Sequence, residues 1–173
     1  MKKGLKRLVK SKYNLDDLFK RVEENSIIFL RLYINALDNA VRAMAESNVR
    51  GLIKWTWNSI EYLVKYLSAV HVRELYRVLK RKIINSYRDK NIDVDEETIV
   101  ESIVPRLHKS IRPRARVLEE IKPELKGLYE TVLWAEALFL ALQEGYEDEI
   151  EIKDIAIRVL SQIQALSKKI HLF

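Results

Sequence analysis

The side chains in this sequence that could bind phosphate groups gather in two segments. The first places cations every three or four residues, so that they share one helix face, at Arg73, Arg77, Lys80 and Arg81. The second crowds cations around a proline, in what we expect to be an exposed connection: Arg106, Lys109, Arg112, Arg114 and Arg116. A guanidinium group donates paired hydrogen bonds to phosphate oxygens, so both segments are candidate nucleic-acid contacts. The alternative is that each is a solvated charged face, balanced by nearby glutamates.

The residues that catalysis or metal binding would need are sparse. The chain has no cysteine, and its three histidines, His71, His108 and His171, stand far apart. No HExxH, serine-nucleophile or glycine-rich phosphate motif occurs. The acidic run at 147–151 lacks the glycine of a calcium loop. We therefore expect no metal site, no cofactor and no catalytic residue, with His108 as the one candidate acid–base group because it lies in a basic segment.

The elements that must position these residues are helices. Apolar residues make up 48% of the 173 residues, while glycine (4) and proline (3) are scarce, which leaves little of the turn chemistry that β-hairpins need. We predict an all-α fold, a single bundle of about five to seven helices over residues 13–173. Residues 1–12, rich in lysine, are predicted to form a basic N-terminal arm.

Local signals place the helix ends. Asn14 and Asp95 precede helical patterns as N-caps, Pro123 suits a first helical position, and Gly145 suits the end of the most apolar helix. Pro105 should kink or end its helix. One stripe follows helical spacing over about five turns, at Ile27, Leu30, Ile34, Leu37, Val41 and Met44. Of the tryptophans, Trp57 fits the core, and Trp55 fits a rim or a subunit interface.

Two blocks of the sequence resemble the HEPN superfamily, and within it the archaeal PaREP1-like proteins. The first, residues 31–70, reads RLYINALDNAVRAMAESNVRGLIKWTWNSIEYLVKYLSAV; it pairs two amphipathic helices across a polar break, with an aromatic-rich start to the second. The other block, residues 128–166, joins a helix containing Trp134-Ala135 to an amphipathic last helix through Gly145-Tyr146. The resemblance implies a helical bundle that forms a homodimer, often in contact with nucleic acid or nucleotides.

Many HEPN proteins are RNases whose mark is an arginine followed, four to six residues later, by a histidine. This sequence departs from that pattern, because no arginine stands at those positions before any of the three histidines. The segment of the Trp134 helix where relatives carry a histidine holds Phe139, Leu140, Ala141 and Leu142 instead. If the chain is HEPN-like, we expect a member without RNase chemistry.

The leading hypothesis is thus a non-catalytic HEPN-like dimer that associates with RNA, DNA or a partner protein. One alternative is a structural nucleoprotein, of a viral or chromatin type, that coats DNA through its basic arm. Another is an atypical HEPN RNase toxin that uses His108 and the surrounding arginines. No apolar run approaches the roughly 20 residues of a membrane span, and no signal peptide is evident, so we expect a cytoplasmic protein. The abundance of Lys, Arg, Glu and Ile leans towards a thermophile.

Overall fold

The computed structural model describes residues 14–146 and 148–172, apart from the side chain of His108, so the predicted arm at 1–12 lies outside the described residues. All regular structure in the described ranges is helical, which confirms the predicted all-α bundle. The elements are α2 (Leu15–Glu24), α3 (Ser26–Ala45), α4 (Val49–Val70), α5 (Val72–Asp89), α6 (Glu96–His108), α7 (Ile111–Ile121), the short 3-10 helix η1 (Pro123–Leu125), α8 (Leu128–Gln143) and α9 (Ile150–Lys169).

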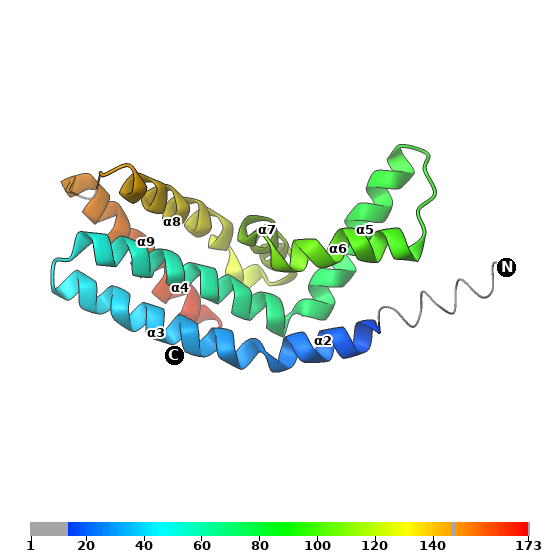
Figure 1. Cartoon of the computed structure of the whole chain (residues 1–173), viewed down its shortest axis with the longest axis horizontal. Helices are drawn as coiled ribbons and strands as arrows, with labels where there is room; N and C mark the ends of the chain where they lie inside the picture. Colours follow the sequence, from blue (N-terminus) through cyan, green and yellow to red (C-terminus); the bar gives the residue numbers. More distant parts are fainter. Residues whose placement is uncertain (1–13, 147, 173) are drawn as a thin grey trace.

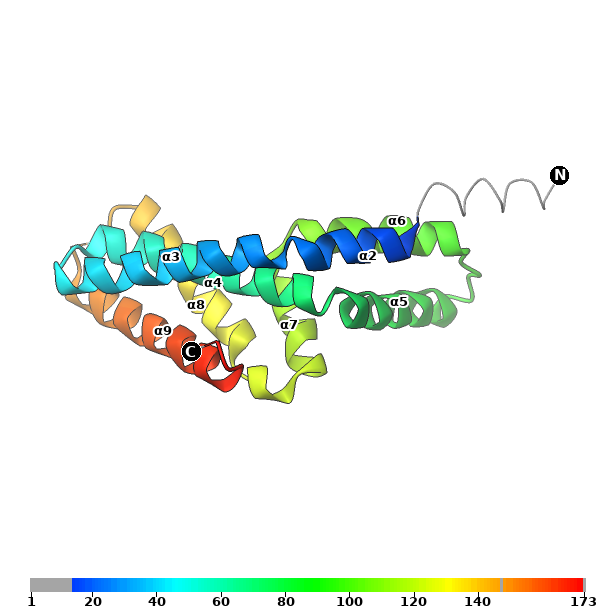
Figure 2. The same cartoon turned by 90° about the horizontal axis from the view of Figure 1, so that it is seen from below.

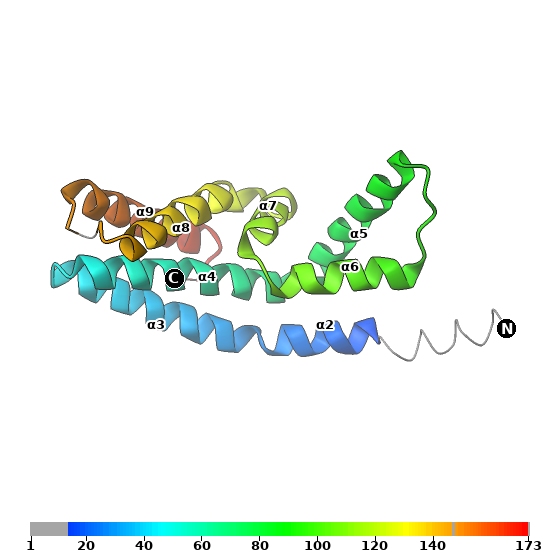
Figure 3. The ribbon, with the colours of Figure 1, turned by 45° about the horizontal axis from the view of Figure 1, so that its top comes forward.

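Helix α4 lies at the centre of the arrangement. It contacts α3 along its length and also meets α7, α8 and α9. Figure 3 shows α2 and α3 following one another along one side of α4, with α7, α8 and α9 on the other side. Helices α5 and α6 form a second hairpin beyond the far end of α4 (Figures 1 and 2). No other helix in the described ranges covers the outer face of α3 (Figure 3).

The predicted hairpin of residues 31–70 is confirmed as α3 and α4. Small residues of α3, Ala36, Ala40 and Ala43, are buried, so the two backbones can approach closely. Helix α3 ends with Ser47 in the left-handed region (φ 54°), and the N–H of Asn48 donates back to the carbonyl of Ala43 at 2.8 Å. This is the hydrogen bond of a Schellman cap, made here without glycine.

Several predicted helix ends are also confirmed. Asn14 accepts a hydrogen bond from the N–H of Asp17, and Asp95 accepts one from the N–H of Thr98. Gly145 follows α8 with φ 87°, and the N–H of Tyr146 donates to the carbonyl of Ala141 at 3.0 Å. Local cap chemistry, in which a side-chain oxygen or a left-handed residue satisfies free backbone groups, was thus readable from the sequence.

The predictions made from the prolines are less accurate than those made from the helix caps. Helix α6 continues through Pro105 and ends at His108. The basic stretch after it is not a connection, because α7 begins at Ile111 and holds Pro113 in its first turn, where a missing N–H costs no helical hydrogen bond. Pro123 begins η1 rather than the next long helix. Helix α8 starts only after Gly127, whose φ of 96° turns the chain.

The core runs through the α3–α4 hairpin into α7, α8 and α9. Leu63 and Leu138, predicted to be core residues, are buried. Trp57 is partly buried and stacks on Phe139, with ring centroids 5.8 Å apart, whereas Trp134 is 46% exposed. Within the described ranges, no helix combines the length and the apolar character needed to cross a lipid bilayer.

Candidate functional site

The basic residues of α5 divide into paired and free cations. Arg73 is held against α2: its Nε donates to Glu23 at 2.8 Å, its Nη1 donates to Asp16 at 3.2 Å, and its guanidinium lies over the ring of Phe19 at 5.3 Å. These carboxylates raise the pKa of Arg73. Lys80 likewise donates to Glu96 of α6 at 2.8 Å. Arg73 and Lys80 thus form ion pairs between neighbouring helices, and these pairs occupy the donors that would otherwise contact phosphate.

Arg77 and Arg81 are exposed on the same helix. Among the described residues neither has an ion-pair or hydrogen-bond partner. Arg88 is exposed two turns further along that face, and its side chain also has no such partner. Three exposed arginines without such partners thus lie along α5, and two of them, Arg77 and Arg81, belong to the predicted face. We call these three the α5 arginine row (Arg77, Arg81 and Arg88).

The second predicted segment is split by the fold. Arg106 and Lys109 are exposed at the end of α6, without an ion-pair partner in the described ranges. Arg112 donates to Glu136 of α8. The guanidinium of Arg116 lies 4.3 Å from the centroid of the Tyr129 ring and donates to its hydroxyl at 3.1 Å. Of the exposed cations in this segment, only Arg106 and Lys109 thus have no ion pair or ring contact within the described ranges.

Arg114 corrects the prediction most clearly, because it is only 4% exposed. Its Nε donates to the carbonyl of Ser110 at 3.0 Å, and its buried Nη2 has no hydrogen-bond partner among the described residues. The sequence did hold a signal for this burial. Ile111, Arg114, Ala115 and Leu118 follow the i, i+3, i+4, i+7 pattern of a helix face turned to the core, and all are buried.

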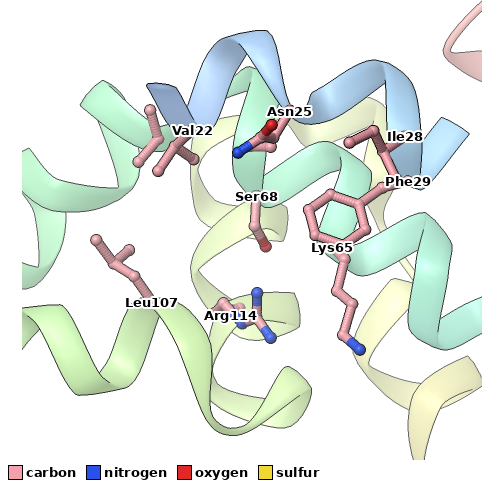
Figure 4. A pocket seen from close by; sticks show the side chains of 10 residues that line it. Val22, Asn25, Ile28, Phe29, Lys65, Ser68, Leu107 and Arg114 are labelled. Carbon is pink, nitrogen blue, oxygen red and sulfur yellow. The ribbon is translucent and has the colours of Figure 1, made fainter. Parts of the chain in front are cut away.

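Arg114 lies at a cavity of about 370 Å³ that the sequence did not reveal. The cavity forms where α2 gives way to α3 at Asn25, and its opposite walls come from α4, the start of α5, the end of α6 and α7. Figure 4 shows the guanidinium of Arg114 on the α7 side, pointing towards Ser68 of α4, with Lys65 beside it. Apolar side chains supply most of the remaining lining: Val22, Ile28, Phe29, Ala69, Val72 and Leu107.

Electrostatics in this region favour negative charge. Burial lowers the pKa of Arg114 to about 10, and Glu61 partly opposes that shift; the guanidinium stays charged at neutral pH. The carboxylate of Glu61 is itself bonded to Lys65 at 2.8 Å. Arg114 and Lys65 thus carry two positive charges against the one negative charge of Glu61, which leaves a net positive charge in this region. A site of this composition suits an anion.

Two of the three histidines line the same hollow. Burial lowers the pKa of His71, which lines a shallow hollow with His171, Lys122 and Glu124. The side chain of His108 lies outside the described residues. Across the ranges that the structure describes, no group of three or more His, Asp or Glu residues is placed to hold a metal ion.

Comparison of the chain with known protein families, with curated proteins and with solved structures gives no match.

Proposed function

We propose that this chain is a non-catalytic, HEPN-like helical dimer that binds nucleic acid in the cytoplasm. The observation that carries the proposal is the contrast between free and paired cations. Arg73, Lys80 and Arg112 are matched to carboxylates of neighbouring helices, whereas Arg77, Arg81, Arg106 and Lys109 are exposed and unmatched among the described residues. Arginines without a carboxylate partner, spaced along one helix face, can contact phosphates of a nucleic acid. Each such contact contributes to affinity because it releases counterions from the nucleic acid.

Two other functions stay as rivals. A nucleoprotein that coats DNA would depend on the arm at 1–12, and an atypical RNase would depend on His108. Neither the arm nor the His108 side chain belongs to the described residues. The proposal of binding without cleavage rests on the sequence, which lacks the arginine that the HEPN motif places before its histidine.

The test is a salt titration of binding to labelled single- and double-stranded RNA and DNA. We expect wild-type affinity to fall steeply with salt. The double variant Arg77→Gln/Arg81→Gln should bind more weakly, and its slope of log affinity against log salt should be shallower by roughly 1.5 to 2, as expected for two lost phosphate contacts. Arg106→Gln/Lys109→Gln should behave similarly if the end of α6 shares the surface.

The matched control is Arg73→Gln/Arg112→Gln, which removes the same net charge from cations already paired with carboxylates. It should leave the slope nearly unchanged. Equal losses in both variants would mean that only overall charge matters and would contradict the α5 arginine row as the contact. Incubation followed by product analysis tests the second half of the proposal: cleavage that disappears in His108→Ala would favour the RNase, and binding lost on deleting residues 1–12 would favour the coating protein.

A further inference from the structure

We propose that the cavity beside Arg114 binds a small apolar molecule that carries a single anionic head group, a carboxylate or a phosphate monoester, with Arg114 as its anchor. The inference is separate from nucleic-acid binding, since none of the free cations of the α5 arginine row or of Arg106 and Lys109 lines this cavity. Its volume, about 370 Å³, lies within the range of roughly 300–1,000 Å³ found for small-molecule sites.

The first argument is the state of the guanidinium. A buried charge is tolerated when it is paired and fully hydrogen-bonded, yet Arg114 is 4% exposed and makes one hydrogen bond, from Nε to Ser110. Its Nη2 has none. An apolar side chain of similar length would serve stability alone at least as well. The charge is therefore best explained by something that it binds.

The second argument is that the nearby carboxylate is already engaged. Glu61 is close enough to influence Arg114 electrostatically, but it accepts a hydrogen bond from Lys65 at 2.8 Å, and no direct bond joins it to Arg114. Arg114 and Lys65 both line the cavity, and an entering anion would meet the guanidinium of Arg114. Its negative charge would balance the local excess of one positive charge.

The third argument concerns the body of the ligand. Beyond Arg114, Lys65, Asn25 and Ser68, the lining is apolar. The hydroxyl of Ser68 already donates to the carbonyl of Val64 at 2.6 Å, so it does not call for a polar ligand group. Ile28 is 52% exposed at this site, and a bound apolar chain would cover it. A head group alone would leave these walls facing water.

The experiment uses the full chain and titrates four probes by calorimetry: octanoate, octyl phosphate, octanol and inorganic phosphate. We expect octanoate, octyl phosphate or both to bind at least tenfold more tightly than octanol, which lacks the charge, and than inorganic phosphate, which lacks the apolar body. The ratio of the two octyl acids distinguishes a carboxylate ligand from a phosphate ester. Octanol binding as tightly as the acids, or no binding of either acid at millimolar concentration, would overturn the proposal.

Arg114→Met provides the decisive variant, because it keeps an unbranched, flexible side chain at this position and removes the charge. The melting temperature should be unchanged or higher, since a buried unpaired charge has been removed, while affinity for the octyl acids should fall about tenfold to a hundredfold, the usual range for a lost hydrogen bond to a charged group. The matched control is Arg77→Met, an exposed arginine outside the cavity, which should bind as wild type. A less stable Arg114→Met that still binds the acids would show that Arg114 is a structural residue.

Discussion

The hydroxyl of Tyr33 on α3 donates a hydrogen bond to the hydroxyl of Ser167 on α9, and both residues are buried. The direction follows from the second contact of Ser167, whose hydroxyl donates its single hydrogen to the carbonyl of Ile163 at 2.9 Å. Tyr33 therefore links two helices that are far apart in sequence. Burial raises the pKa of its phenol to about 12, against a smaller lowering by Ser167.

Replacing Tyr33 by phenylalanine should lower the free energy of unfolding by about 1 kcal/mol, the usual net value of a buried hydrogen bond. Ser167 keeps its bond to Ile163, so no donor is left unsatisfied. The matched control is Tyr76→Phe, because the buried hydroxyl of Tyr76 has no hydrogen-bond partner in the part of the chain that the structure describes, and its removal should leave stability unchanged or higher. Urea unfolding of the three proteins checks this, and equal losses in both variants would contradict it.

The raised pKa of Tyr33 also predicts a dependence on alkaline pH. Below pH 10 the phenol is protonated in the folded and the unfolded chain alike. Between pH 10 and about 12 the unfolded chain releases this proton while the folded chain keeps it, so stability falls as pH rises, on the order of 1 kcal/mol for each pH unit. Subtracting the profile of Tyr33→Phe from that of wild type isolates this loss. If the difference in the free energy of unfolding does not change with pH across that interval, burial does not raise the pKa of Tyr33.

The sequence predicted most of the fold because its signals were local. The N-caps Asn14 and Asp95 depend on neighbours within one or two turns and lie where their patterns placed them. The stripe at 27–44 does lie on one helix, α3, but Ile27, Ile34 and Val41 are exposed. The errors arose where a residue type has two local meanings. The prediction treats Pro113 as a helix breaker, although proline is also favoured in the first turn of a helix. Because α7 begins just before Pro113, Arg114 lies on a buried helix face and not in an exposed connection.

The candidate site was less predictable, because which cations are free depends on contacts between distant segments. Arg73 and Arg77 look alike in the sequence, and only the position of α2 separates them by placing Asp16 and Glu23 beside Arg73. The cavity is a sharper case. It is assembled from six helices, and no spacing along the chain connects Asn25 with Arg114. The HEPN resemblance, and the function derived from it, stay predictions.

Core truncations test the packing around α4. Leu63 of α4 is fully buried and Leu138 of α8 is 3% exposed, so replacement of either by alanine should cost about 2–5 kcal/mol. The matched control is Leu140→Ala on α8, where the side chain is 52% exposed and the loss should stay within about 1 kcal/mol. Chemical denaturation monitored by circular dichroism gives all three values. Losses below about 1 kcal/mol at both core positions would place the core face elsewhere.

The N-cap of α4 predicts a coupling between Asn48 and Gly51. The side-chain oxygen of Asn48 accepts from the N–H of Gly51 at 2.9 Å, and a Cβ on residue 51 would come within 2.7 Å of the Asn48 amide nitrogen. Gly51→Ala should therefore gain little in wild type, although alanine normally stabilises a helix by about 0.5–1 kcal/mol over glycine. In the Asn48→Ala background, itself costing about 1 kcal/mol, the full gain should appear. Additive effects in a double-mutant cycle would contradict the clash.

The uncovered face of α3 predicts where a second copy would bind. Ile27, Ile34 and Val41 recur at intervals of seven and are 48%, 38% and 36% exposed. They form an apolar seam on this face; Leu30 and Met44 beside it are partly buried against the core, and Leu37 is buried in the core. Arg31 and Asp38 flank the seam, both exposed and without an ion-pair partner among the described residues. Two antiparallel copies of α3 would place Arg31 of each near Asp38 of the other.

We therefore predict that the chain sediments as a dimer at micromolar concentration, at twice the 20.4 kDa of one copy. Ile34→Glu should give monomers, since it puts a charge into the seam, whereas Leu140→Glu, at an exposed position on α8, should leave the dimer intact. Arg31→Glu and Asp38→Arg should each weaken association by setting like charges against each other. The double reversal should restore it, and because these residues lie about two turns apart on one helix, rescue can only arise between copies. A wild-type monomer, or failure of the double reversal to recover the dimer lost in the single variants, would remove this face from the interface.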